Sequence, residues 1–329
     1  MTAFHPINIA LFAILVITAL AIARIRQLFA AAMLSGLFSL ACACIFVLHD
    51  AVDVAFTEAA VGAGMTTVLF LCTLALTDSR EKSTPPRRSV PAALAALLTG
   101  AALIYASADL PKFAAADTPV QQHPLTERYL RDSATEIGIP NVVTSVLASY
   151  RGYDTLGETV VIFTAAIAVL MLLGRTAHAK TSDAVMSLHT RHRVLRVVTK
   201  LLVPFILVFA LYVQFHGDYG PGGGFQAGVI FASGLILYGL VFGLEAARGV
   251  APVRVLRRLV AAGVLIYGGV GVATLVAGGA FLDYDALDPG HPATGQHLGI
   301  LLVELGVGIT VAAAMLMLFL SFAGRRDAR

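Results

Sequence analysis

Two glutamates stand inside apolar stretches that are long enough to cross a lipid bilayer. They are Glu58 and Glu304. Each lies about eight residues from the predicted outer end of its stretch, which corresponds to a depth of about 12 Å. An ionisable side chain at such a depth costs about 2.5–3.5 kcal/mol and generally marks an ion or proton path. Burial favours the protonated carboxyl, and hydration releases the proton. Both residues are therefore candidate proton carriers, and the alternative is a neutral carboxyl that serves packing alone.

Four further ionisable side chains lie near the ends of such stretches. They are Asp53, Glu158, Lys200 and His216. Each has a plain structural interpretation, because carboxylates near the interface are hydrated, lysines extend to the membrane surface and histidines titrate near neutrality without necessarily carrying protons. We nevertheless include all four, with Glu58 and Glu304, in the predicted ion and proton pathway.

A glycine-rich connector joins two apolar stretches at residues 216–225. Its centre is Pro221, Gly222, Gly223, Gly224 and Phe225. Proline followed by three glycines makes poor helix. Irregular backbone at membrane depth is tolerated where protein buries it or where it lines a hydrated cavity. The connector is either a short hairpin loop outside the lipid or a packed segment inside the protein.

The composition is that of an integral membrane protein. Hydrophobic residues make up 58% of the chain and charged residues 13%. A hydrocarbon core of about 30 Å needs about 20 apolar residues per helix. This criterion predicts an all-α protein with about nine transmembrane helices. The predicted spans are residues 5–23, 28–48, 52–77, 90–107, 155–173, 199–216, 222–243, 256–279 and 297–322.

The basic residues orient these spans. Nineteen of the 23 lysines and arginines fall in alternate connections and at the C-terminal end, and the other four are Lys112, Arg128, Arg131 and Arg151. Cytoplasmic loops carry an excess of Lys and Arg. The pattern predicts an N-terminus outside and a cytoplasmic C-terminus. The net charge of +3 thus reflects topology, and we expect no nucleic-acid partner.

The sequence offers no sign of covalent chemistry. The three cysteines, Cys42, Cys44 and Cys72, lie in apolar stretches without metal-binding spacing. Phosphate-binding, metalloprotease and hydrolase motifs are missing from the sequence. We expect no catalytic residues, no metal site and no cofactor, and hence no enzyme.

Four stretches of the second half resemble one family of transporters. Residues 201–205, 216–217 and 221–228, together with residues 303–308, are similar to the B subunit (MnhB-like) of Mrp-type multisubunit cation/proton antiporters. This resemblance covers about residues 190–322.

The first half resembles another part of the same complexes. Residues 53–62, 141–144 and 150–158 look like the C-terminal part of the large A subunit. That part is related to small membrane subunits of membrane-bound hydrogenases and of respiratory complex I. We therefore expect an A-like membrane domain over residues 1–175 with a periplasmic loop near 108–154. A basic cytoplasmic linker at 176–198 and a B-like domain at 199–329 complete the chain.

The chain departs from the family pattern at three places. Val52 stands where a proline is usual, and Asp218-Tyr219-Gly220 replaces the usual histidine-containing connector. The large antiporter-like body of the A subunit is missing. The resemblance therefore implies that its ion-path lysines and glutamates belong to another chain.

These observations predict a membrane subunit of a Mrp-type Na⁺(K⁺)/H⁺ antiporter in a bacterial inner membrane. The resemblance implies partners in the large A and D subunits and the small C, E, F and G subunits, within the lipid bilayer. Only Na⁺ or K⁺ and H⁺ would pass as transported ions. Two alternatives remain: a scaffold subunit that carries no ion, and the equivalent module of an energy-converting hydrogenase or respiratory complex.

Overall fold

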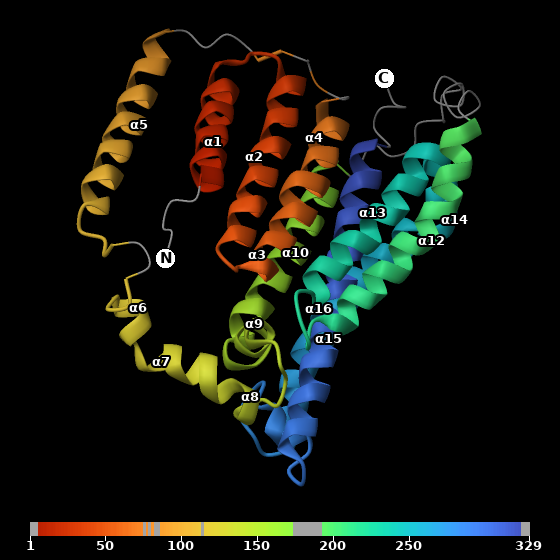
Figure 1. Ribbon diagram of the computed structural model, residues 1–329. Coiled ribbons are helices and arrows are strands. Elements are labelled where there is room, and N and C mark those ends of the chain that lie inside the picture. Colours follow the sequence, from red (N-terminus) through yellow and green to blue (C-terminus); the bar gives the residue numbers. More distant parts are fainter. Residues whose placement is uncertain are drawn as a thin grey trace.

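The computed structural model describes residues 6–74, 77, 80–81, 86–112, 115–173 and 193–323. Within these ranges the fold is all-α, and nine helices are long and apolar enough to cross a membrane (Figure 1). They are α1 (Pro6–Arg24), α2 (Leu28–Leu48), the composite span α3–η1–α4 (Val52–Leu74), α5 (Pro86–Ser107), α10 (Gly152–Leu173), α12 (Arg193–His216), α13 (Gly224–Phe242), α15 (Val253–Val276) and α16 (Pro292–Ala323). The predicted helical architecture is confirmed. Most of the predicted linker lies outside the described residues.

Short helices fill the connections between these spans. They are α6 (Pro119–Gln122), α7 (Pro124–Glu127), η2 (Arg128–Asp132), α8 (Ser133–Glu136), α9 (Val142–Thr144), η3 (Ser145–Tyr150), α14 (Leu244–Val250) and η5 (Tyr284–Leu287). The first six form the long connection between α5 and α10, which runs beneath the bundle in Figure 1. We call this connection, residues 108–151, the long loop.

The central helix of the bundle is α16. It packs against α13, α15 and α10. Of the most apolar 18-residue stretch of α16, 61% is buried. Its 32 residues extend about 48 Å at 1.5 Å per residue, more than a hydrocarbon core of about 30 Å. The helix α16 is therefore longer than the hydrocarbon core, and it also packs against η5 and against η3 of the long loop.

The helix α5 lies at the opposite extreme. No part of its apolar stretch, Val90–Ser107, is buried, and Figure 1 shows α5 standing apart from α1. Exposed apolar side chains such as Leu97, Ile104 and Tyr105 cover it. In a bilayer these side chains face lipid or the helices of other subunits.

The third span changes its winding at mid-membrane. Between α3 (Val52–Thr57) and α4 (Thr66–Leu74), residues Glu58–Met65 form the π-helix η1. Gly62 and Gly64 within it lower the cost of this distortion. Winding of this kind displaces side chains from their α-helical directions, so the face that Glu58 occupies does not follow from a 3.6-residue period.

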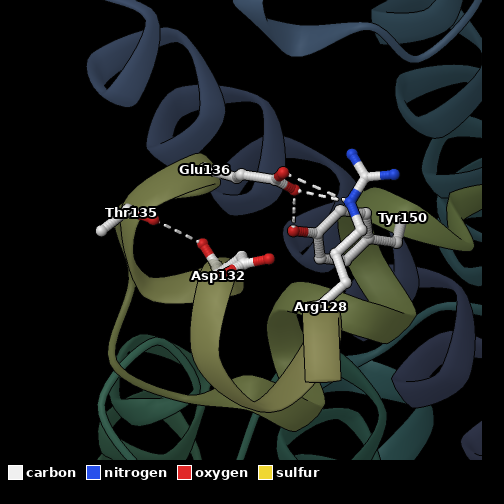
Figure 2. Close-up of polar contacts among 5 residues, drawn as sticks. All are labelled: Arg128, Asp132, Thr135, Glu136 and Tyr150. Atoms are coloured by element: carbon white, nitrogen blue, oxygen red, sulfur yellow. Dashed lines mark hydrogen bonds and ion pairs between the residues drawn. The ribbon is translucent and has the colours of Figure 1, made fainter. Parts of the chain in front are cut away.

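A polar clasp stabilises the long loop. Arg128 donates a hydrogen bond from Nε to Oε2 of Glu136 at 3.0 Å, and the Tyr150 hydroxyl donates to the same oxygen (Figure 2). The Arg128 guanidinium lies over the Tyr150 ring, 5.4 Å from its centre. These hydrogen bonds, from Tyr150 first and then from Arg128, hold the pKa of Glu136 below its ordinary value. Desolvation and the Glu136 charge raise the pKa of Tyr150 to about 12, so the hydroxyl stays protonated and donates.

Two buried tyrosines attach the end of this loop to the second half of the chain. The Tyr284 hydroxyl donates to the carbonyl oxygen of Ala148 at 2.8 Å, and that of Tyr267 donates to the carbonyl oxygen of Gly152 at 2.7 Å. Both rings are fully buried. The segment from Asn141 to the start of α10 is thereby fixed against α15 and η5.

Candidate ion and proton site

The glycine connector is a packed segment. Gly222, Gly223 and Gly224 are all buried, and the Gly223 N–H donates to the carbonyl oxygen of Val213 at 3.0 Å. Gly223 has a φ of 102°, a conformation that L side chains rarely adopt. The helix α13 then begins at Gly224. Of the two sequence interpretations, the structure shows the packed one.

Asn141 holds the connector from the long loop. Its side-chain amide donates to the carbonyl oxygens of Gly217 and Gly220, both at 2.9 Å. Its backbone N–H donates to the carbonyl oxygen of Asp218 at 3.0 Å. The hydroxyl of Thr144 adds a bond to Gly217 at 2.7 Å. The connector carbonyls, which lie outside any helix, are thus satisfied by the long loop.

Glu304 lies directly behind the connector. A Cβ at Gly223 would be 2.8 Å from Oε1 of Glu304, and a Cβ at Gly217 would be 3.1 Å from Oε2. A side chain at either position would collide with the carboxyl group. The glycines therefore create the space in which the Glu304 carboxyl lies.

Three carboxylates line one cavity beside the connector. The cavity has a volume of about 250 Å³, and its lining includes Asp53 from α3, Glu158 from α10 and Glu304 from α16. Gly222, Gly223, Gly224 and Phe225 complete part of its wall. Carboxylates from the third, fifth and ninth spans therefore line a single cavity, which we call the acidic cavity.

Neutral polar groups complete the wall. Gln226 donates from Nε2 to the hydroxyl of Thr57 at 2.8 Å, which joins α13 to α3. Thr144, Thr155 and Thr159 also line the cavity. Within the described ranges, no three His, Cys, Asp or Glu side chains come close enough to bind a metal ion together. The carboxylates are thus spaced along the wall and do not form a chelating cluster.

A histidine and an aspartate pair next to this cavity. Nδ1 of His297 lies 2.8 Å from Oδ2 of Asp218. The Asp218 side chain is 7% exposed and that of His297 is 51% exposed. Burial raises the pKa of Asp218, and the neighbouring His297 opposes this rise. The pair connects the surface to a buried carboxyl on the connector.

The structure does not place every predicted pathway residue at the cavity. Glu58 lies on the side of η1 that meets α2, since its Oε1 and the Ser39 hydroxyl both approach Gly62. Lys200 is exposed near the other end of α12, 5.9 Å from the centre of the Phe242 ring. The His216 ring stacks on Tyr212 at 5.0 Å. Pro221 precedes the buried glycines but does not line the cavity.

Comparisons with known proteins fit this arrangement. Residues 194–317 match the family model described as a domain related to the MnhB subunit of Na⁺/H⁺ antiporter. Residues 13–79 match the model for the D subunit of MBH, and residues 87–191 match that for the E subunit of MBH. An antiporter subunit named mnhB2 from Staphylococcus aureus (strain Newman) is 37% identical over 136 residues, which are 41% of this chain and 96% of that protein.

The chain belongs to the MnhB family of antiporter subunits. Its MnhB part contains the glycine connector and Glu304, whereas Asp53 and Glu158 come from the parts that match the D and E subunits of MBH. The cavity is therefore formed jointly by these parts. The resemblance to the B subunit and to hydrogenase-type subunits, predicted from sequence motifs, is confirmed.

Solved structures extend the similarity to nearly the whole MnhB-family chain. One chain of the Mrp complex from Dietzia sp. DQ12-45-1b aligns with a TM-score of 0.74 and 28% identity, covering 94% of this chain and 34% of that one. This protein thus spans about a third of that longer polypeptide. A chain of the membrane-bound sulfane sulfur reductase, an archaeal respiratory membrane complex, aligns with a TM-score of 0.55 and 28% identity, covering 70% of this chain and 96% of that one.

Proposed function

We propose that this protein is a membrane subunit of a Mrp-type cation/proton antiporter and that its acidic cavity is part of the ion or proton path. The observation that carries the proposal is the meeting of Asp53, Glu158 and Glu304 around one cavity. Each comes from a different span, and ionisable groups in membrane spans are costly, so those present generally serve a function. The family relationship and the alignment to a Mrp complex support the same conclusion.

The protein works within a complex of a bacterial cell membrane. Its exposed apolar helices α1 and α5 require cover by lipid or other subunits. Its partners are the large A-type and D-type antiporter subunits and the small C, E, F and G subunits. The exchanged ions, Na⁺ or K⁺ and H⁺, are its only small ligands, and it catalyses no covalent reaction.

Sodium-driven proton exchange by a conservative variant of Glu304 tests whether the cavity is part of the ion or proton path. Glu304→Gln keeps the size of the side chain but cannot titrate. A positioned proton-transferring group typically contributes about 10²–10⁴-fold, so we expect sodium-driven proton exchange in everted vesicles to fall by at least about tenfold in the assembled complex. Glu127→Gln is the matched control, because Glu127 is an exposed carboxylate paired with Arg131 away from the cavity. Normal exchange in Glu304→Gln would remove Glu304 from the path.

The same variant separates transport from the scaffold alternative. A scaffold role predicts that Glu304→Gln either changes nothing or prevents assembly, since only packing would depend on it. Glu58 remains a predicted pathway residue on its own face, and Glu58→Gln tests it in the same assay. Lys200→Gln and His216→Gln do so for the two residues at the ends of α12.

A second candidate function is the equivalent module of a redox-driven respiratory complex. It is favoured by the alignment to the sulfane sulfur reductase complex and by the MBH-type matches. Identification of co-purifying subunits separates the two. Nickel or iron–sulfur proteins in the purified complex would support this second function, whereas several small membrane subunits without redox partners support the antiporter.

A further inference from the structure

The pair of His297 and Asp218 lies between the protein surface and the acidic cavity. His297 is on α16 seven residues before Glu304, so both side chains lie on the same face of that helix, about 10 Å apart along its axis. The connector lies between them: Asp218 contacts His297, and the neighbouring Gly217 faces Glu304. The three groups thus follow one another from the surface inward.

Exposure falls from His297 to Asp218, whereas Glu304 is partly exposed because it lines the cavity. His297 is half exposed, whereas the carboxyl of Asp218 is almost fully buried. Asp218 and Asp53 are both close enough to Glu304 to interact with it electrostatically. Imidazole is the side chain whose ordinary titration lies nearest to neutral pH. A half-exposed imidazole that touches a buried carboxyl can therefore collect protons from water and pass them inward.

We propose that His297 and Asp218 form the proton relay through which the acidic cavity exchanges protons with the aqueous side that bears the long loop. This inference rests on the proposed function of the cavity. In each transfer, the imidazolium of His297, protonated at both nitrogens, gives its Nδ1 proton to the Asp218 carboxylate and becomes a neutral ring protonated at Nε2. The half-exposed ring then turns so that water returns a proton to Nδ1. A water molecule then carries the proton from Asp218 to Glu304, whose carboxyl lies beside Gly217.

Other titratable groups surround the pair. Asp53 lies 3.5 Å from the Asn141 amide that holds the connector, and Asp285 accepts a bond from Gln296, the neighbour of His297. His216 lies beside Gly220 at the other end of the connector turn. Within the part of the chain that the structure describes, the ion pair of the His297 imidazole is with Asp218.

Two substitutions separate the relay from a purely structural staple. His297→Gln retains an N–H donor for Asp218 but does not titrate near neutral pH, whereas His297→Ala loses both properties. The matched control is His291→Gln. His291 also pairs with an aspartate, Asp288, at 3.7 Å on the same side of the bundle, but its side chain is 81% exposed and its partner is not on the connector.

The measurement is sodium-driven proton exchange by the assembled complex as a function of pH on the long-loop side. We expect His297→Gln to lose about tenfold or more of the rate near neutral pH, with a changed pH profile, and Asp218→Asn to behave similarly. His291→Gln should retain the wild-type rate and profile. These results with normal assembly would establish the relay.

Three outcomes would overturn it. Wild-type rate and pH profile in His297→Gln, equal losses in His297→Gln and His291→Gln, or failure of His297→Gln to assemble would each show that the pair has another role. If exchange is lost in Glu304→Gln but normal in His297→Gln, only the relay is wrong. If Glu304→Gln exchanges normally, the cavity function itself is wrong.

Discussion

The side-chain amide of Asn141 donates to the carbonyl oxygen of Gly217, and this bond joins the long loop to the glycine connector across 76 residues of sequence. The same amide also donates to the carbonyl oxygen of Gly220. Because Asn141 also caps α9 through its side-chain oxygen, one residue fixes both the loop helix and the connector. The shape of the acidic cavity therefore depends on a side chain that does not line it.

Asn141→Ala tests this dependence. The change removes the side-chain donor of the Gly220 carbonyl and one of the two side-chain donors of the Gly217 carbonyl, and an unsatisfied buried group costs about 1–3 kcal/mol. We expect a clear fall in the thermal stability of the purified complex and a loss of exchange. Gln122→Ala, an exposed amide in the same loop, should change neither. A wild-type melting temperature in Asn141→Ala would show that the Thr144 hydroxyl and the backbone N–H of residue 141 are sufficient to hold the connector.

Substitutions at Gly223 and Gly278 separate the cost of a strained backbone from the cost of overpacking. Gly223→Ala meets a positive φ and a Cβ contact of 2.8 Å with Glu304. Gly278→Ala meets a similar φ of 93° in open space. The strained backbone costs about 1–3 kcal/mol in each, and overpacking adds about 1–3 kcal/mol only at Gly223.

We therefore expect Gly223→Ala, and more so Gly223→Val, to reduce complex yield and exchange, while Gly278→Ala lowers stability only moderately. Equal yields and equal rates in the two alanine variants would mean that the Glu304 carboxyl moves aside without consequence.

Acid should release the clasp of the long loop. Since the folded-state pKa of Glu136 lies below its unfolded value, the clasp contributes fully above the ordinary glutamate value of 4.5 and is lost as the pH falls through the folded-state pKa. A nitroxide label at Ala134→Cys, an exposed site in α8, should become more mobile over that window. The same label should be mobile at all pH values with Glu136→Gln, and unaffected by Glu127→Gln. A mobility that does not respond to acid would argue against the clasp.

Cysteine labelling tests the predicted orientation. In a background that lacks Cys42, Cys44 and Cys72, Val120→Cys in the long loop should react with an impermeant reagent from outside, and Val185→Cys only from the cytoplasm. Val120 is exposed, and Val185 lies outside the described residues. Labelling of either position from the opposite side would show that the predicted orientation is wrong.

The sequence predicted the spans well because each depends on local composition. It also marked Asp53, Glu158 and Glu304 as ionisable groups near or within apolar stretches, which the structure brings to one cavity. It placed Asn141, Thr144 and Gln226 in family-like stretches without giving them a role, and it did not predict the pairing of Asp218 with His297. These residues act through contacts between distant parts of the chain, and no local pattern encodes such contacts. The π-helix η1 likewise turns Glu58 toward α2, which a regular helical period does not predict.

The unequal burial of α16 and α5 predicts unequal rates of amide hydrogen exchange in the two helices. Helices that open independently exchange their amide hydrogens at rates set by their own contacts. In the detergent-solubilised protein without partners, α16 should be the most protected span and α5 the least, because their apolar windows are 61% and 0% buried. The gain in deuterium protection of α5 after assembly would then identify the surface on which the rest of the complex is built.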